Sequence, residues 1–492
     1  MKYGFSNKQL KEIVSFFREY SEVEEAVLFG SRAIDTYKEA SDVDIALKGN
    51  NVTASLSAKM KFNIEEDTYL PFFFDFIAYS TITSEELKQH IRNKGVVIYR
   101  RGRGWKEEIL EDIAFVNPTE SLRNGKKAKK VAMEILQPFT KKIHSYPIEE
   151  YKGGVKFKNG DTLVARITPS LENGKTAFVD FLDENEIGFG STEFIVLREK
   201  ENVSYNHFLY YLAISPEFRK AAILSMTGSS GRQRVQTEVV KNHSFLLPPL
   251  SEQKAIAAVL CSLDDKIDLL HRQNKTLEAM AETLFRQWFV EESQDDWEEK
   301  TLSRITEHKK VNLQPKKNPS TIYHHYSIPT FDERQQPISE FGLKIQSNKY
   351  KVFPNAILIS KLNPRFPRVW AIPPIIKDNS ICSTEFQVVL PISNEWYGFI
   401  YCLLKSKQVS DELIGAAGGT SGSHQRVKPE DIFNITFSVP DKETLSKFDV
   451  ITRDYWPKIN INRKQIYTLE KLRDTLLPKL MRGEIRVKGF ND

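Results

Sequence analysis

The chain repeats itself, because four short motifs recur at a constant separation of 192 residues. The recurring motifs are W-x4-L-x-x-I (from Trp105 and Trp297), S-T-E-F (from Ser191 and Ser383), Q-R-V (from Gln233 and Gln425) and T-L-E (from Thr276 and Thr468). One shared tripeptide carries little weight, but four matches at one offset define two copies, about 105–296 and 297–488. The first 104 residues are then a domain of a different kind.

Each copy changes from a strand-like to a helix-like pattern. Short β-rich runs such as 162–167 and 386–390 lie among turns that contain Gly and Pro, which predicts a compact α+β module. One long helix follows each module. The first is expected from an N-cap at Ser251 to Phe289, which is about 58 Å at about 1.5 Å per residue, and the second after Pro457.

The first long helix carries residues spaced alternately by four and three, which is the heptad pattern of a coiled coil, and the second carries a similar apolar stripe. Asn274 and Asn462 interrupt the two stripes, either as a buried polar pair that fixes the register or as solvated edge positions. We therefore expect an antiparallel helix pair that holds two similar modules at a fixed separation.

Composition limits the class of protein. With 492 residues, 40% of them hydrophobic and 27% charged, the chain has room for about three globular domains. No apolar run is long enough to span a bilayer, and three cysteines without a Cys-x-x-Cys pair form neither a disulfide framework nor a zinc knuckle, so we expect a cytoplasmic protein. The net charge of +5 falls entirely in 105–492, which permits a nucleic-acid face there.

The two copies resemble the DNA-specificity subunit of type I restriction-modification systems. The resemblance rests on the repeated S-T-E-F, on P-P-L-S-E-Q-K-A-I at 248–256 and on L-R-D-T-L-L-P-K-L-M-R-G-E-I at 472–485. It implies two target-recognition domains that each read half of a bipartite, asymmetric site in double-stranded DNA. It also implies that the long helices act as a spacer and dock methyltransferase (modification) subunits and restriction (translocase and nuclease) subunits, through which S-adenosylmethionine and ATP would act.

The polar and basic loops of both copies are the candidate DNA contacts, with solvated loop residues and phosphate contacts as the alternatives. They are Arg166, Thr168, Ser229, Ser230, Arg232, Gln233 and Arg234 in the first copy, and Lys361, Asn363, Arg365, Arg368, Ser423, His424, Gln425 and Arg426 in the second. The repeated Glu193 and Glu385 are expected to be structural, since modules that read different sequences should not share a base contact. A helix of about 58 Å limits the gap between module centres to about 17 base pairs.

Residues 1–104 contain candidate residues for a separate chemistry. A strand at 27–29 leads into Gly30 and Ser31, Asp42 and Asp44 share one face of the next strand, and Asp75 lies in a third strand. Carboxylates that converge beside a backbone loop can hold Mg²⁺ against nucleotide phosphates. We therefore expect Asp42, Asp44 and Asp75 to be catalytic, Asp42 and Asp44 to bind the metal, and the Gly-Ser pair to bind the nucleotide.

This G-S…D-x-D…D spacing resembles the minimal nucleotidyltransferases of the polymerase-β superfold, over residues 20–101. The resemblance implies Mg²⁺ and a nucleoside triphosphate as cofactors, and transfer of a nucleotide, often AMP, to a protein or a small acceptor. Ile34 and Asp35 replace the Arg-Gly of many relatives. The alternative is a binding scaffold without activity.

The sequence thus predicts an α+β protein with two target-recognition domains joined by long antiparallel coiled-coil helices in a pseudo-twofold repeat. The expected parts are a nucleotidyltransferase-like domain (1–104), target-recognition domain 1 (105–250), a first long helix (251–296), target-recognition domain 2 (297–440) and a second helix with the C-terminus (441–492). The leading function is a type I specificity subunit. The alternative is an AMP-transferring, antitoxin-like nucleotidyltransferase that the specificity modules localise to DNA.

Overall fold

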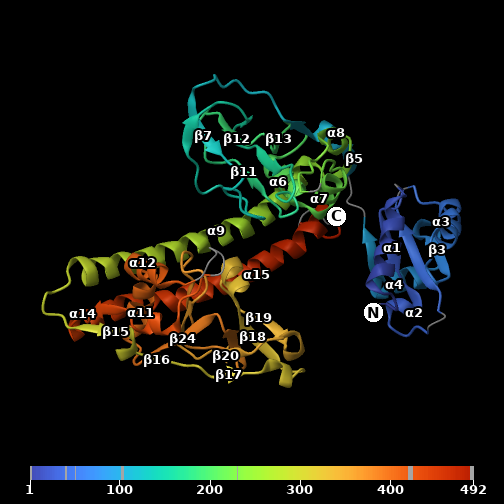
Figure 1. Cartoon of the computed structure of the whole chain (residues 1–492). Coiled ribbons are helices and arrows are strands. Elements are labelled where there is room, and N and C mark those ends of the chain that lie inside the picture. The colour runs from blue at the N-terminus through green and yellow to red at the C-terminus, as the bar shows by residue number, and fades with distance from the viewer. Residues whose placement is uncertain are drawn as a thin grey trace. The chain divides into compact units, whose positions relative to one another are not determined.

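The computed structural model describes residues 3–20, 22–38, 41–49, 51–100, 105–229, 231–418 and 425–487 (Figure 1). Its contacts form two compact units, Met1–Asp264 with Leu472–Asp492, and Asp265–Lys471. Within the described ranges, no helix is both long and apolar enough to cross a membrane.

The N-terminal domain is a four-stranded sheet with helices packed against it. Its elements are α1 (Asn7–Arg18), β1 (Glu25–Leu28), α2 (Gly30–Ala33), β2 (Val43–Lys48), α3 (Ala54–Asp67), β3 (Phe74–Ala78), η1 (Tyr79–Thr81), α4 (Glu85–Lys94) and β4 (Val96–Arg100). The strand order is β3-β2-β1-β4, and only β2 and β3 run parallel. Aromatic side chains such as Phe17 and Phe74 fill the core. This parallel pair places the ends of two strands, and the acids on them, side by side.

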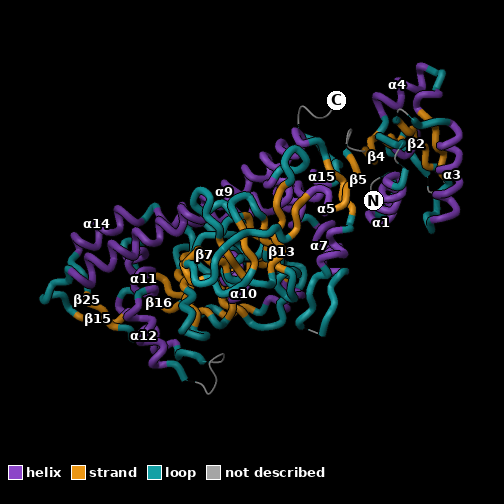
Figure 2. Tube along the Cα trace, turned by 90° about the horizontal axis from the view of Figure 1, so that it is seen from above, coloured by secondary structure: helices purple, strands orange, loops and turns teal. Residues whose placement is uncertain are grey.

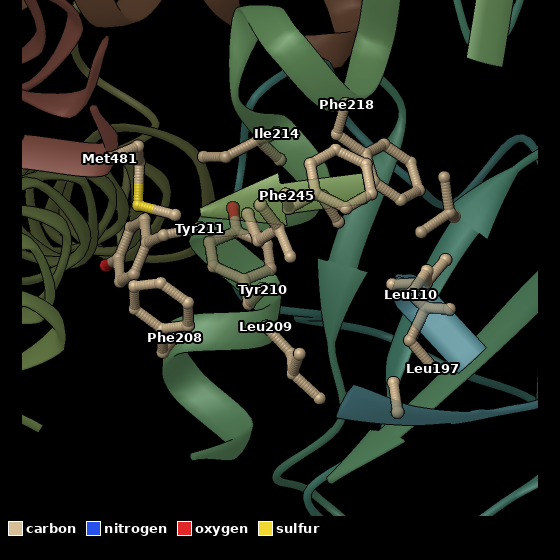
Figure 3. Close-up of a cluster of buried hydrophobic side chains, with 14 of the residues drawn as sticks. Leu110, Leu197, Phe208, Leu209, Tyr210, Tyr211, Ile214, Phe218, Phe245 and Met481 are labelled. Carbon is tan, nitrogen blue, oxygen red and sulfur yellow. The ribbon is translucent and has the colours of Figure 1, made fainter. Parts of the chain in front are cut away.

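The first module of the repeat contains two four-stranded sheets and one buried helix. Its elements are β5 (Lys106–Ile109), α5 (Leu110–Ile113), β6 (Ala114–Val116), β7 (Lys127–Val131), β8 (Ile148–Glu150), β9 (Val155–Phe157), β10 (Thr162–Ala165), β11 (Thr176–Phe178), β12 (Gly188–Gly190), β13 (Phe194–Glu199), α6 (Asn206–Ile214), α7 (Pro216–Leu224), α8 (Thr237–Lys241) and β14 (Ser244–Leu247). Residues Phe208–Ile214 of α6 are all buried, and Figure 3 shows Tyr210 and Tyr211 near Phe208 and Met481 in that core.

The second module is built from a similar series of elements. They are β15 (Glu299–Thr301), η3 (Leu302–Arg304), β16 (Thr306–His308), β17 (Asn312–Leu313), η4 (Pro315–Lys317), β18 (Ile322–Tyr326), α10 (Ile328–Arg334), β19 (Ile338–Phe341), η5 (Gly342–Lys344), β20 (Lys349–Lys351), β21 (Ile357–Ser360), β22 (Val369–Ala371), β23 (Ser380–Ser383), β24 (Phe386–Pro391), α11 (Trp396–Lys405), α12 (Lys407–Ala416), α13 (Pro429–Phe433), β25 (Thr436–Ser438) and α14 (Lys442–Thr452).

The repeat in the sequence is a repeat in topology. The sheet order β11-β10-β13-β6 of the first module corresponds to β22-β21-β24-β16 of the second, and the pair β14-β5 corresponds to β25-β15. The S-T-E-F motif leads into the equivalent strands β13 and β24. The other sheet differs, because it has four strands (β8-β7-β12-β9) in the first module and five (β17-β20-β23-β18-β19) in the second. The described structure therefore confirms two related but non-identical α+β modules.

The two long helices are α9 (Leu250–Arg286), which continues as the π-helical turn η2 (Gln287–Glu291), and α15 (Tyr455–Met481). With 37 residues, α9 is about 55 Å long. The expected N-cap at Ser251 is wrong, since the helix already begins at Leu250 and the Pro249 carbonyl accepts from the amides of Glu252 and Gln253. Pro457 lies in the first turn of α15, where a missing amide hydrogen is tolerated.

Contacts within each unit show that α9 and α15 run antiparallel, and the two ribbons lie alongside each other in Figures 1 and 2. Ile267 and Leu270 pack with Ile466, while the amide of Asn462 donates to Asn274 Oδ1 at 2.9 Å. Both asparagines are buried. The two asparagines thus form the buried polar pair that one of the two interpretations predicts, and the solvated-edge alternative is excluded.

We expect the Asn274→Ala variant to lose about 1–3 kcal/mol of stability, because the buried Asn462 amide loses its best acceptor and keeps only a longer contact with Gln273. Chemical unfolding followed by circular dichroism measures the change. The exposed neighbour offers a matched control, Lys275→Ala, which should stay within about 0.5 kcal/mol of the parent. Equal stability of the two variants would contradict a polar pair that stabilises the seam.

Candidate DNA interface and nucleotide site

In the first module, three segments far apart in the sequence meet along the end of β10. The Arg166 amide donates to the Glu193 carbonyl at 2.9 Å, and the Arg166 carbonyl accepts from the Val235 amide at 2.9 Å. The Thr168 amide donates to the Gln233 carbonyl at 3.0 Å. The S-T-E-F and Q-R-V motifs therefore lie on either side of the candidate contacts that follow β10.

An ion pair joins the two motifs through their side chains. Arg234 Nε lies 2.9 Å from Glu193 Oε1 and 3.0 Å from Oε2, and Arg234 Nη2 lies 2.7 Å from Oε1. A second arginine is close by, with Arg166 Nε 3.9 Å from Glu193 Oε2. The hydrogen bonds from Arg234 hold the pKa of Glu193 below its usual value, against the opposing effect of partial burial. This carboxylate is thus an anchor for two arginines, one of which is 45% exposed.

The second module builds the same arrangement. The Lys361 amide donates to the Glu385 carbonyl at 2.9 Å, and the Val427 amide donates to the Lys361 carbonyl at 3.0 Å. The Asn363 amide donates to the Gln425 carbonyl at 2.8 Å. Lys361 and Asn363 therefore occupy the backbone positions that Arg166 and Thr168 occupy in the first module.

The ion pair recurs as well. Arg426 Nε lies 3.2 Å from Glu385 Oε2, and Arg426 Nη2 lies 3.2 Å from Oε1. The glutamate stands 41 residues before the arginine in both modules. Glu193 and Glu385 were expected to be structural, without a named partner, and this equal spacing was a signal that could have identified the arginines.

The remaining candidate DNA contacts divide into three groups. Arg368 is engaged inside its module, with Nε 2.7 Å from Asp332 Oδ1 and Nη2 2.9 Å from Oδ2, and its side chain is only 15% exposed. Arg232, Ser229 and Arg365 are exposed and remain available to a ligand. Ser230, Ser423 and His424 lie outside the described residues.

In the N-terminal domain, the sheet brings two of the predicted acids together. Asp44 on β2 is the register partner of Asp75 on β3, and paired residues of parallel strands share a face. Asp42 directly precedes β2. Gly30 follows β1 with φ +72°, and the space where a Cβ atom would stand is occupied by the Asp44 carboxylate. Any larger residue at this glycine would displace the acid, so the Gly-Ser turn and the D-x-D motif form one site.

Acidic and basic side chains both act on Asp44 in this site. Burial raises the pKa of Asp44 above its usual value, the charges of Asp75 and Asp42 raise it further, and Arg32 opposes them. Asp75 has a salt bridge of 3.5 Å to Lys61. In the part of the chain that the structure describes, no group of three or more His, Cys, Asp or Glu side chains is placed to hold a metal. Two carboxylates completed by water still suit Mg²⁺, which usually keeps several of its waters.

Arg32, which no sequence motif singled out, is 1% exposed. Its Nη2 donates to the Ser41 carbonyl at 2.7 Å, and its Nε lies 3.1 Å from the same oxygen and 3.2 Å from the Asp42 carbonyl. The guanidinium also faces the Phe5 and Phe72 rings. Arg32 therefore fixes the segment that carries Asp42, and only its place after Gly-Ser could have indicated this.

Comparisons with known proteins bear on both parts of the chain. Residues 102–279 match the family model of the type I restriction modification DNA specificity domain, and residues 11–103 match that of polymerase beta nucleotidyltransferases. The EcoAI specificity subunit of Escherichia coli is 31% identical over 218 residues, which cover 42% of this chain and 36% of that subunit. The MjaIX specificity subunit of Methanocaldococcus jannaschii is 27% identical over 312 residues, which cover 58% of this chain and 70% of that subunit.

Among solved structures, a type I S subunit from M. genitalium aligns with 77% of this chain and 96% of its own, at 17% identity and a TM-score of 0.49. The chain thus spans about a third of the length of the EcoAI subunit and 70% of that of the MjaIX subunit. By these findings residues 102–279 resemble the specificity subunits of type I restriction-modification systems, and residues 11–103 resemble nucleotidyltransferases of the polymerase-beta kind.

Proposed function

We propose that this chain is the DNA sequence-specificity subunit of a type I restriction-modification complex in the cytoplasm. In this proposal it binds a bipartite, asymmetric site in double-stranded DNA and docks methyltransferase and restriction subunits. The observation that carries the proposal is the arrangement of the S-T-E-F and Q-R-V segments that both modules share. Two modules of like topology place an exposed, ion-paired arginine at equivalent positions.

The difference between the modules supports an asymmetric site. Arg166 and Thr168 of the first module stand where Lys361 and Asn363 stand in the second. Direct readout depends on side chains in the major groove, where arginine or lysine pairs with guanine and asparagine pairs with adenine. The two modules share one backbone arrangement but carry different side chains on it, so they should read two different half-sites.

Methylation and cleavage belong to the partner subunits in this proposal. The N-P-R-F stretch at 363–366 has no glycine-rich cofactor loop before it, and G-S-S-G at 228–231 lacks the ending of a phosphate loop. S-adenosylmethionine and ATP would then act only on the methyltransferase and restriction subunits.

A base-resolution methylation map of host DNA, with and without this gene and with its methyltransferase partner present, tests the proposal. We expect a bipartite methylated motif that appears only when this gene is present. An active methyltransferase that yields no such motif would refute the specificity function.

The second candidate function is nucleotidyl transfer by the N-terminal domain, and the carboxylate cluster around Asp44 favours it. Asp42 and Asp44 would hold Mg²⁺, which neutralises phosphate charge when bound. Gly30 and Ser31 would place backbone amides beside the phosphates, and Asp75 would orient the attacking hydroxyl group.

A further inference from the structure

Each module has an arginine at the equivalent position, while the side chains beside it differ between the modules. We propose that Arg234 and Arg426 contact DNA phosphates without regard to sequence, that Glu193 and Glu385 orient them, and that the differing neighbours read the bases. This inference rests on the proposed specificity function and assigns roles within that same surface.

The geometry leaves each arginine ready for an outside ligand. Glu193 takes the Nε and Nη2 side of Arg234, and Glu385 takes the same side of Arg426. Among the described residues, no other side chain makes an ion pair with either arginine. The arginine side chains are 45% and 49% exposed, so a ligand can reach each guanidinium. A planar group held on one side in this way is fixed in orientation before it meets an anion.

The duplication itself argues for a phosphate ligand. A base contact kept in both modules would require the same base at the same point of both half-sites, whereas phosphates are present at every step of every sequence. In the first module Arg166 lies near the same glutamate, so the group of two arginines and one carboxylate keeps a positive charge toward DNA. An ion pair that occurs in both modules is therefore suited to bind phosphates, which occur in both half-sites.

The base readers would be the neighbours that differ. Arg166 and Lys361 bond through their carbonyls to the residue after the shared arginine, and Thr168 and Asn363 bond to the residue before it. These backbone hydrogen bonds hold the differing residues at the same position relative to the shared arginine in both modules. A fixed phosphate contact would set the register from which these side chains reach the base edges.

The test uses the full chain assembled with its methyltransferase subunits. Dissociation constants for cognate and unrelated duplexes are measured across a salt series, and the methylated motif is mapped in the same strains. For Arg234→Gln and for Arg426→Gln we expect weaker binding by a similar factor on both duplexes, a salt slope smaller by about 1, and an unchanged motif. The matched reader variants Arg166→Gln and Asn363→Ala should instead relax one half of the motif, by roughly 5- to 150-fold in discrimination.

Two further variants separate these roles from a structural one. Arg234→Lys keeps the charge and should keep both the salt slope and the motif, while Lys59→Gln, at an exposed site on α3 of the N-terminal domain, should change neither. A motif altered by Arg234→Gln would overturn the inference by making Arg234 a reader. A folded Arg234→Gln chain with unchanged affinity and salt slope would also overturn it, by making the ion pair purely structural. If the unmodified chain produces no motif, the proposed function itself fails, and that result is distinct from either outcome.

Discussion

The Arg473→Ala variant is expected to lower the stability of the first module by about 3–5 kcal/mol, because it leaves a buried charge without its partner. Arg473 Nη1 lies 2.9 Å from Asp264 Oδ1 and 3.1 Å from the Phe139 carbonyl, and the Tyr211 hydroxyl donates to Asp264 Oδ2 at 2.7 Å. Asp264 and Arg473 are both under a tenth exposed. Burial alone would lower the pKa of Arg473, but Asp264 and Asp474 raise it above its usual value. The R-D of the closing motif thus connects α15 to the core of the first module.

Hydrogen exchange of peptides from α6 measures this effect where it arises, and peptides from α11 in the second module serve as an internal reference. The double variant Arg473→Leu with Asp264→Leu should recover much of the loss, since removing both charges leaves neither one unpaired. The exposed Lys479 gives a control on the same helix, and Lys479→Ala should change protection by less than about 0.5 kcal/mol. Unchanged exchange in α6 of the single variant would show that this pair does not hold the helix to the module.

The second large effect is expected in the N-terminal domain, where Asp44→Ala should reduce nucleotidyl transfer roughly a thousandfold. A metal ion contributes several kcal/mol of transition-state stabilisation, and about 4 kcal/mol corresponds to that factor. Label from radioactive ATP with Mg²⁺, collected on the chain and its partners, is the measurement. Glu66→Ala is the matched control, since Glu66 is an exposed acid on α3 and should leave transfer unchanged. Transfer that survives in Asp44→Ala would remove this carboxylate from the chemistry.

Stability gives the same site a readout that does not require activity. Because the pKa of Asp44 is raised in the folded domain, the native state holds that proton more tightly than the unfolded chain does. Stability contributed by the protonated acid is present below the ordinary Asp pKa and is lost as the pH rises through the raised value. At neutral pH we therefore expect Asp44→Asn to melt above the parent without Mg²⁺. Mg²⁺ at about ten times its dissociation constant should stabilise the parent by about 1.4 kcal/mol and the variant by less. A parent that Mg²⁺ does not stabilise would contradict the metal site.

The N-terminal domain and the rest of the chain can be tested separately. Deleting residues 1–104 should leave the methylated motif intact if the specificity region acts alone, and should abolish label transfer if the N-terminal domain carries it. A motif lost in that truncation would show that the specificity region requires the N-terminal domain.

Much of this organisation could be predicted from the sequence because it depends on local order. Motifs at one offset define a repeat whatever the fold, and a four-three apolar stripe from Ile256 onward indicates a long paired helix from periodicity alone. The same reasoning placed Asn274 opposite Asn462 as one of two alternatives, and the buried 2.9 Å contact selected it. The D-x-D spacing likewise put Asp42 and Asp44 close together.

Only the tertiary structure decided how side chains tens of residues apart meet. Arg234 binds Glu193 because the Q-R-V segment bonds to the end of β10, Arg368 is occupied by Asp332, and Asp44 fits against Gly30 because that residue lacks a Cβ atom. Residue type and spacing determine which local element forms. The partners of a charged side chain depend on how those elements pack, and that packing distinguishes an arginine oriented toward solvent from one bound within the module.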